Sequence, residues 1–152
     1  MTSGTEGEGQ DPPVNPGSEY ALPAINYALV LDDDEGVLST AVRLATRAGY
    51  FSIGTDSIGK FIEQYKKGRP TFLVLDVILG NQDVLSVVDF LAQEKCQAPI
   101  VFMSGFDHRV LNAVQTAARD RGLQVVGTVE KGEGLGRLTH ILTTYHIGPT
   151  PG

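Results

Sequence analysis

Five short apolar segments recur along the chain, and each is followed by a longer segment with apolar residues at helical spacing. The apolar segments are 26–31, 50–53, 72–75, 99–103 and 124–129. They are apolar without alternation, which is typical of strands that are buried on both faces of a parallel sheet. Because parallel strands need crossover connections, the pattern predicts a doubly wound α/β domain, a five-stranded parallel sheet between two layers of helices.

The segments between these strands carry signals for the start and the end of helices. Asp34, Asp83 and Asp107 stand where an N-cap side chain is needed, and either Asp56 or Ser57 serves the second helix. The first, second and fourth helices are expected to end near glycines, namely Gly49, Gly68 and Gly122. The alternation predicts one domain, and a length of 152 residues fits that number.

The two ends of the chain lie outside this alternation. Residues 1–18 contain only two apolar residues, Met1 and Val14, so they cannot bury enough surface to offset the entropy of ordering. We expect residues 1–24 to be a flexible acidic tail or a linker from an upstream module, 25–147 to be the domain, and 148–152 to be frayed.

Composition excludes several classes of function. Residues 1–42 hold eight acidic residues and no Lys or Arg, whereas the remainder is nearly neutral, which argues against direct binding of nucleic acid. No apolar stretch approaches the roughly 18–20 residues of a membrane span, and the N-terminus lacks a secretory signal pattern. The single cysteine, Cys96, cannot form a disulfide or a zinc site alone, which fits a cytoplasmic location.

Polar residues follow four of the predicted strands directly. They are Asp32 and Asp33 after the first strand, Asp76 after the third, Ser104 after the fourth and Lys131 after the fifth. With the strand order 2-1-3-4-5, the first and third strands are neighbours where the order reverses, which is where open parallel sheets bind ligands. We therefore expect the three acids to converge on one pocket.

Three converging carboxylates must either take up protons or bind a cation, because one pair about 4 Å apart costs on the order of 4 kcal/mol at an effective dielectric of 20. A donor set made of oxygen alone favours Mg²⁺ or Ca²⁺. An incomplete cage that leaves room for water and a phosphate oxygen suits Mg²⁺ better. With the ammonium of Lys131 and the hydroxyl of Ser104 added, the set is typical of phosphoryl transfer, with Asp76 as the nucleophile.

At these residues the sequence resembles the CheY-like receiver domain of bacterial two-component response regulators, over about residues 25–146. The resemblance rests on four stretches in the expected order, each at a strand end: VLDDDEGVL, FLVLDVILG, IVFMSG and VEK. It implies the flavodoxin-like sheet order named above. The region from Ser104 to Lys131 is most similar to receivers attached to EAL-type cyclic-di-GMP phosphodiesterases.

The resemblance also implies a role for each site residue. Asp32 and Asp33 match the acidic pair of the family, Asp76 the phosphoacceptor, Ser104 the hydroxyl residue and Lys131 the site lysine. Mg²⁺ is then expected on Asp32, Asp33, Asp76 and the backbone carbonyl of Ile78. The implied donor is a sensor histidine kinase or a histidine phosphotransfer protein, and the implied signal is a change in the face of the fourth helix, fifth strand and last helix. Such a protein catalyses at most its own phosphorylation and dephosphorylation.

Three positions depart from the family pattern. Gly80 and Gly132 stand where the family usually has proline, and Thr128 stands where it usually has an aromatic residue. Glycine permits a turn without fixing one. Because Thr128 carries no ring, we do not expect the family's usual coupling between the hydroxyl residue and an aromatic side chain, whereas we expect the chemistry of Asp76 to be unaffected.

Two other functions remain open. The first is a pseudo-receiver, which has the same fold and serves docking or dimerisation without phosphorylation, so that a second copy of the chain is a candidate partner. The second is a Mg²⁺-dependent phosphatase with an aspartyl-phosphate intermediate, which needs a second acid two residues after the nucleophile. That position is Ile78, which disfavours the phosphatase.

Overall fold

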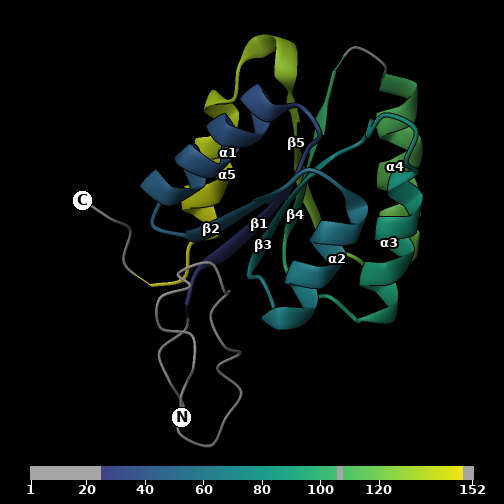
Figure 1. The fold of residues 1–152 in the computed structure, drawn as a ribbon, viewed down its shortest axis with the longest axis horizontal. Helices are drawn as coiled ribbons and strands as arrows, with labels where there is room; N and C mark the ends of the chain where they lie inside the picture. The colour runs from purple at the N-terminus through teal and green to yellow at the C-terminus, as the bar shows by residue number, and fades with distance from the viewer. Residues whose placement is uncertain (1–24, 106–107, 149–152) are drawn as a thin grey trace, which may run out of the picture.

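The computed structural model describes residues 25–105 and 108–148, which form a parallel sheet between two layers of helices (Figure 1). The sheet has the order β2-β1-β3-β4-β5. Its strands are β1 (Tyr27–Leu31), β2 (Phe51–Thr55), β3 (Phe72–Asp76), β4 (Ile100–Ser104) and β5 (Val125–Glu130). The helices are α1 (Glu35–Arg47), α2 (Ile58–Lys67), α3 (Val84–Gln93), α4 (His108–Asp120) and α5 (Gly136–Thr144), with a 3-10 turn at Lys131–Glu133. The predicted fold class and strand order are confirmed.

The two helical layers explain why the strands are apolar on both sides. Helices α1 and α5 cover one face of the sheet, and α2, α3 and α4 cover the other (Figure 1). In β1, Leu29 and Leu31 belong to the core beneath α2, α3 and α4, whereas Ala28 and Val30 belong to the core beneath α1 and α5. Every residue of β1 is buried, so no position in it favours a polar side chain.

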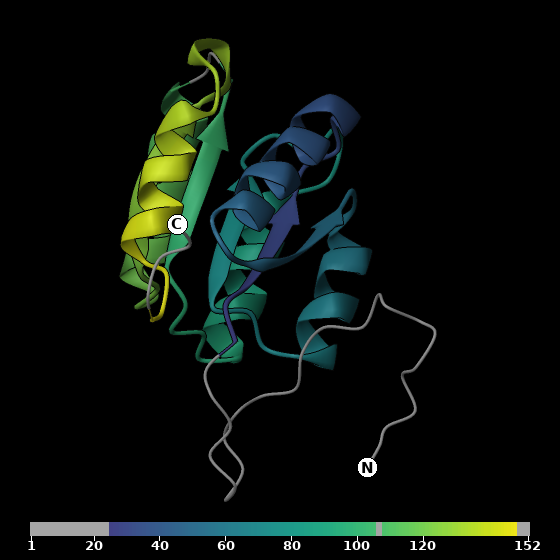
Figure 2. The ribbon, with the colours of Figure 1, turned by 90° about the vertical axis from the view of Figure 1, so that its left-hand side faces the viewer.

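All neighbouring strands are parallel, and their arrows point toward the same end of the molecule (Figure 2). The register aligns the ends: Leu31 pairs with Leu75, and Ser104 pairs with Glu130. The residues that follow these positions, Asp32, Asp76 and Lys131, therefore leave the sheet at one common edge.

Side chains cap the first turn of three helices as the sequence indicates, namely Asp34 for α1, Ser57 for α2 and Asp83 for α3. The alternative cap of α2, Asp56, instead forms an ion pair with Lys60 at 3.1 Å. Asp107, the predicted cap of α4, lies outside the described residues, as do the predicted tail 1–24 and residues 149–152.

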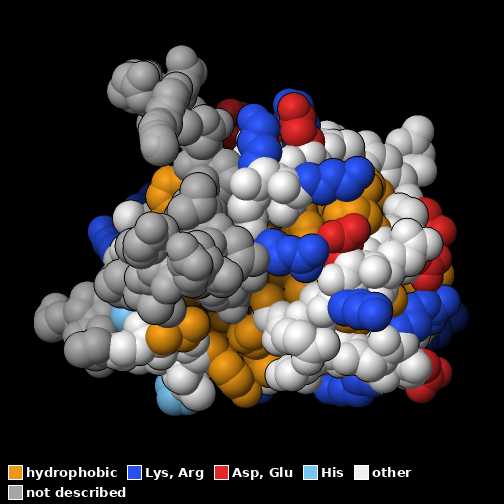
Figure 3. Space-filling model, turned by 90° about the horizontal axis from the view of Figure 1, so that it is seen from below, with side chains coloured by type: hydrophobic (Ala, Val, Ile, Leu, Met, Phe, Trp, Pro, Cys, Tyr) orange, Lys and Arg blue, Asp and Glu red, His pale blue; other side chains and the backbone are white. Residues whose placement is uncertain are grey.

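The end of the molecule where the strands begin carries many charged side chains. Figure 3 views the end opposite to the carboxyl ends of the strands, where Lys and Arg side chains are spread with Asp and Glu between them. Basic residues stand in the last turns of α1, α2 and α4, namely Arg47, Lys66, Lys67 and Arg119. Cations are favoured there because helix C-termini carry partial negative charge. Among the described residues, no helix is long and apolar enough to cross a membrane.

Candidate functional site

Asp32 and Asp76 stand at the carboxyl ends of the adjacent strands β1 and β3, and both side chains are buried. Asp33, the next residue after Asp32, is exposed. Carboxylate oxygens of the three residues all lie within 4.8 Å of one another. The acidic cluster expected from the sequence is therefore present.

Lys131 lies between the two buried acids. Its Nζ atom is 2.8 Å from Oδ2 of Asp32 and 3.0 Å from Oδ2 of Asp76. Lys131 follows β5, which is an outermost strand of the sheet. Its side chain therefore reaches from β5 to the carboxyl ends of β1 and β3. The glycine at position 132 does not prevent Lys131 from reaching the acids.

Each buried acid is also oriented by the turn that follows it. Asp32 Oδ1 accepts a hydrogen bond from the backbone N–H of Asp34 at 2.8 Å, and Asp76 Oδ1 accepts one from the N–H of Ile78 at 3.1 Å. Both are local turns in which an Asp side chain bonds the backbone two residues later. One oxygen of each carboxylate is therefore fixed by the backbone, and the other faces Lys131.

The environment changes the acidity of two of these groups. Burial raises the pKa of Asp76 to about 6, while the N–H of Ile78 and the Lys131 ammonium act in the opposite direction. Burial lowers the pKa of Lys131, but its hydrogen bonds to Asp32 and Asp76 outweigh burial and hold that pKa above its usual value. At neutral pH, Asp76 is therefore mainly a carboxylate and Lys131 is an ammonium.

Ser104 ends β4 and is buried at the same edge of the sheet. Its hydroxyl group donates to the carbonyl of Gly105 at 3.4 Å, a long and therefore weak hydrogen bond. Thr128, at the position where an aromatic residue is usual in the resembling family, is half-buried on β5 opposite Phe102. The hydroxyl of Ser104 is thus weakly held where the β4–α4 connection begins.

The pattern of strand ends did not indicate a contact between His108 and Glu130 that borders the site. His108 Nε2, in the first turn of α4, lies 3.2 Å from Oε2 of Glu130, the last residue of β5. Both side chains are partly exposed, and they come from opposite ends of two consecutive elements, the start of α4 and the end of β5. In the sequence, the one sign that Glu130 lies near the site is its position next to Lys131. That position does not indicate that Glu130 contacts His108.

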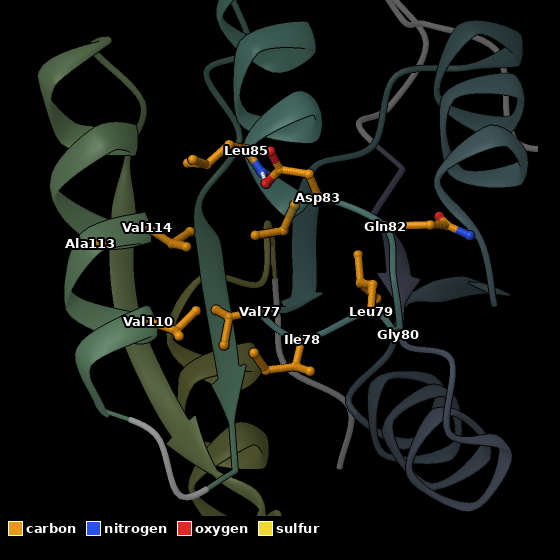
Figure 4. Close-up of a pocket in the computed structure, with 11 residues that line it drawn as sticks. Val77, Ile78, Leu79, Gly80, Gln82, Asp83, Leu85, Val110, Ala113 and Val114 are labelled. Atoms are coloured by element: carbon orange, nitrogen blue, oxygen red, sulfur yellow. Dashed lines mark hydrogen bonds between the residues drawn. The ribbon is translucent and has the colours of Figure 1, made fainter.

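An apolar pocket of about 240 Å³ lies beside the loop that follows Asp76 (Figure 4). Its walls come from that loop, the start of α3 and one side of α4, and include Val77, Leu79, Val110 and Val114. Val77 and Leu79 are buried, whereas the side chain of Ile78 is 48% exposed. The loop is thus anchored by alternate side chains, with Ile78 facing out.

The residues of the cluster fit a divalent cation. The cluster has three carboxylates and one ammonium, that of Lys131, which contacts Asp32 and Asp76, so it keeps an excess of negative charge when all three acids are ionised. A donor set made only of oxygen is the one that Mg²⁺ and Ca²⁺ prefer. The carbonyl of Ile78 follows Asp76 in the same loop, and its role as a ligand stays a prediction.

No protein-family model matches the chain. The alkaline phosphatase synthesis transcriptional regulatory protein PhoP of Bacillus subtilis is 29% identical over 79 residues. That match covers 52% of this chain and 33% of PhoP, so the chain aligns with only about a third of that protein.

Solved structures of response regulators share the fold. A response regulator from Colwellia psychrerythraea matches with a TM-score of 0.67 and 24% identity, over 80% of this chain and 96% of that one. A Burkholderia pseudomallei response regulator with a phosphorylated aspartic acid and a calcium ion matches with a TM-score of 0.64 and 23% identity, over 78% and 67%. TrrA from Thermotoga maritima, in complex with Mg(2+)-BeF, matches with a TM-score of 0.65 and 16% identity, over 80% and 100%. The fold of this chain is that of CheY-like receiver domains.

Proposed function

We propose that residues 25–147 form a receiver domain of a bacterial two-component system, which accepts a phosphoryl group on Asp76 in a Mg²⁺-dependent reaction. The donor is a sensor histidine kinase or a histidine phosphotransfer protein in the cytoplasm. One observation carries the proposal: the buried carboxylate of Asp76 lies 3.0 Å from the Lys131 ammonium, beside the carboxylates of Asp32 and Asp33.

The proposed transfer is a substitution at phosphorus. A carboxylate oxygen of Asp76 forms a bond to phosphorus, the bond between phosphorus and the donor's imidazole nitrogen breaks, and that nitrogen keeps the electron pair. Lys131 supplies a fixed positive charge next to the incoming phosphoryl oxygens, and the weakly held hydroxyl of Ser104 is free to turn toward them. Asp32, Asp33, Asp76 and the carbonyl of Ile78 would hold Mg²⁺, which supplies further positive charge when bound.

Two of the structural relatives support this assignment by what their own structures contain. The Burkholderia protein carries a phosphorylated aspartic acid, and TrrA carries Mg(2+)-BeF. The fold is shared, and this chain places an acidic cluster at the edge of the sheet where such folds bind ligands.

We place the output on the face formed by α4, β5 and α5. Ser104 begins the connection to α4, so drawing its hydroxyl toward a phosphoryl group would pull on that helix. The 3.2 Å contact between the side chains of His108 and Glu130 joins α4 to β5 and would transmit the movement. Thr128 leaves this face without the aromatic ring that the family resemblance would place there.

Labelling with a small phosphodonor tests the proposal. The purified chain with Mg²⁺ and acetyl phosphate should gain the mass of one phosphoryl group, and peptide mapping should place it on Asp76. Asp76→Asn should abolish the gain, whereas Asp120→Asn, at the far end of α4, should be labelled normally. Label that persists in Asp76→Asn would show that another residue is the nucleophile.

Beryllofluoride separates the receiver from the pseudo-receiver. A receiver should show Mg²⁺-dependent changes in its NMR spectrum around Asp76 and on α4 and β5. If the chain gains no mass and shows no such changes, the phosphoaccepting function is wrong. A docking or dimerisation module would then be the better description.

A further inference from the structure

The loop after Asp76 turns sharply at Gly80, whose φ is +61°. The N–H of Gln82 donates to the carbonyl of Leu79 at 2.9 Å, which closes a four-residue turn. Of its two central residues, Gly80 and Asn81, only Gly80 has a positive φ, which is the pattern of a type II′ turn. Residues with a side chain rarely adopt this conformation, so the turn as built requires glycine at position 80.

Contacts on both sides hold this turn in place. Leu79 is buried in the core beneath α2, α3 and α4. Oε1 of Gln82 accepts a hydrogen bond at 3.0 Å from the N–H of Ile58, the first residue of α2. In Figure 4 the side chain of Gln82 points away from Val110 and Val114. Because it is held at both ends, the turn cannot easily shift to accommodate a larger residue.

The missing side chain of Gly80 faces one member of the acidic cluster. A Cβ atom at this position would lie 3.3 Å from Oδ2 of Asp33, closer than most such contacts in proteins. Asp33 is the exposed acid of the cluster, so its carboxylate would be the group that moves. The absence of a side chain at position 80 therefore allows the turn to lie directly against a carboxylate that faces Asp32 and Asp76.

We propose that Gly80 is a positioning residue for the cation site. By bringing a turn without a side chain against Asp33, it sets where that carboxylate stands relative to Asp32 and Asp76. The inference rests on the proposed function in one respect: the cation is the Mg²⁺ that supports phosphorylation of Asp76. Partners that orient metal ligands typically change affinity by about 10–100-fold when they are altered.

Magnesium binding by the full chain tests this inference without any measurement of phosphorylation. In a calorimetric titration, Mg²⁺ should bind to Gly80→Ala about tenfold more weakly than to the unaltered protein. Gly122→Ala is the matched control, because Gly122 also has a positive φ, of 82°, but a Cβ there would meet nothing within 4 Å. It should lose stability through backbone strain and keep its affinity for Mg²⁺.

Two further variants separate the contact with Asp33 from strain and misfolding. Gly80→Asn keeps a Cβ atom in a residue that tolerates positive φ better, so it should lose a similar amount of affinity with a smaller loss of thermal stability. In an Asp33→Asn background, Gly80→Ala should cause little additional loss, because the group through which Gly80 acts is already altered.

The inference is overturned if Gly80→Ala and Gly80→Asn bind Mg²⁺ as tightly as the unaltered chain, or if Gly122→Ala loses as much affinity. It is also overturned if the unaltered chain binds no Mg²⁺. These outcomes are distinct from failure of the proposed function. If Gly80→Ala binds Mg²⁺ more weakly but Asp76 of the unaltered chain takes no label, the inference about Gly80 is supported and the proposed phosphoaccepting function is contradicted. If Asp76 is labelled but Gly80→Ala keeps its Mg²⁺ affinity, the proposed function is supported and the inference about Gly80 is contradicted.

Discussion

Asp76 combines two properties that oppose each other in a folded protein. Its carboxylate is buried, which favours the protonated form, yet the Ile78 N–H and Lys131 hold it ready to ionise. The result is a pKa of about 6, so the group is ionised at neutral pH, and this ionisation lowers the free energy of unfolding. This is the arrangement expected of a nucleophile rather than of a structural acid.

Asp76→Asn should therefore stabilise the metal-free protein at pH 7. The pKa of Asp76 is raised from 3.8 to about 6 on folding, so the folded state binds more protons between these values and stability falls as pH rises through them. The asparagine variant lacks this fall and should be more stable at pH 7 by up to about 3 kcal/mol. Urea unfolding in EDTA from pH 4 to pH 7 measures the difference.

The gain in Asp76→Asn should shrink as pH falls from 6 to 4 and disappear below the unfolded pKa of 3.8, where the carboxyl group is protonated in both states. Asp120→Asn, which removes an exposed acid remote from the site, should show no such pH dependence. Equal stability of Asp76→Asn and the unaltered chain at pH 7 would mean that burial does not dominate the acidity of Asp76.

The site residues could be predicted from the sequence because each polar residue directly follows a strand that is otherwise apolar. Asp32, Asp33, Asp76 and Lys131 come together as expected, since parallel strands bring their carboxyl ends to one edge. The pair His108 and Glu130 could not be predicted in this way. Its members are partly exposed on separate elements, where no burial requirement restricts which side chains meet.

At the scale of elements, the run Asp32 to Glu35 divides into two tasks. Asp32 and Asp33 belong to the acidic cluster, whereas Asp34 caps α1 by accepting a hydrogen bond from the N–H of Val37 at 3.1 Å. The change of role occurs where the chain leaves β1 and begins the helix. Adjacent acids of the same type therefore serve either the site or the helix, depending on the direction in which each points.

Asp34→Ala should lower the free energy of unfolding by about 1 kcal/mol, because the first turn of α1 loses its cap. Asp34→Ser, which keeps a capping oxygen, should lose much less. Neither variant should change Mg²⁺ affinity by more than about twofold, since Asp34 supplies no oxygen to the cluster. Chemical denaturation with a parallel Mg²⁺ titration checks both statements, and a large loss of affinity in Asp34→Ser would contradict the division of roles.

Element boundaries could be predicted from caps and glycines, but the backbone at each glycine could not. Gly49 and Gly122 follow α1 and α4 with positive φ, as helix ends often require. Gly68 also ends α2, yet its φ of −169° is extended, a conformation open to any residue. Glycine allows both signs of φ, so its presence marks a break without determining the shape of the turn.

At the scale of the whole molecule, binding one cation should stabilise the entire fold. The acidic cluster draws residues from β1 and β3, and Lys131 connects them to the end of β5. Unfolding separates these strands and destroys the site. A ligand that binds only the folded state at 100 times its dissociation constant adds about 2.7 kcal/mol.

Thermal unfolding with and without Mg²⁺ measures this gain. The unaltered chain should unfold at a higher temperature as Mg²⁺ increases, and Asp33→Asn should lose most of the effect. Asp120→Asn removes the same charge at the opposite end of α4 and should keep it. If Asp120→Asn loses the effect equally, the stabilisation reflects general screening of the acidic chain rather than a defined site.

The turn at Gly80 has a consequence for protein engineering. Stabilisation by consensus replaces an unusual residue with the one most frequent in a family, and the pattern of the resembling receiver family would suggest proline at position 80. A proline ring fixes φ near −65°, whereas the backbone at position 80 has a φ of +61°. Averaging over relatives would thus introduce a residue that this backbone cannot accept. For this loop, the choice of residue has to follow local geometry rather than frequency.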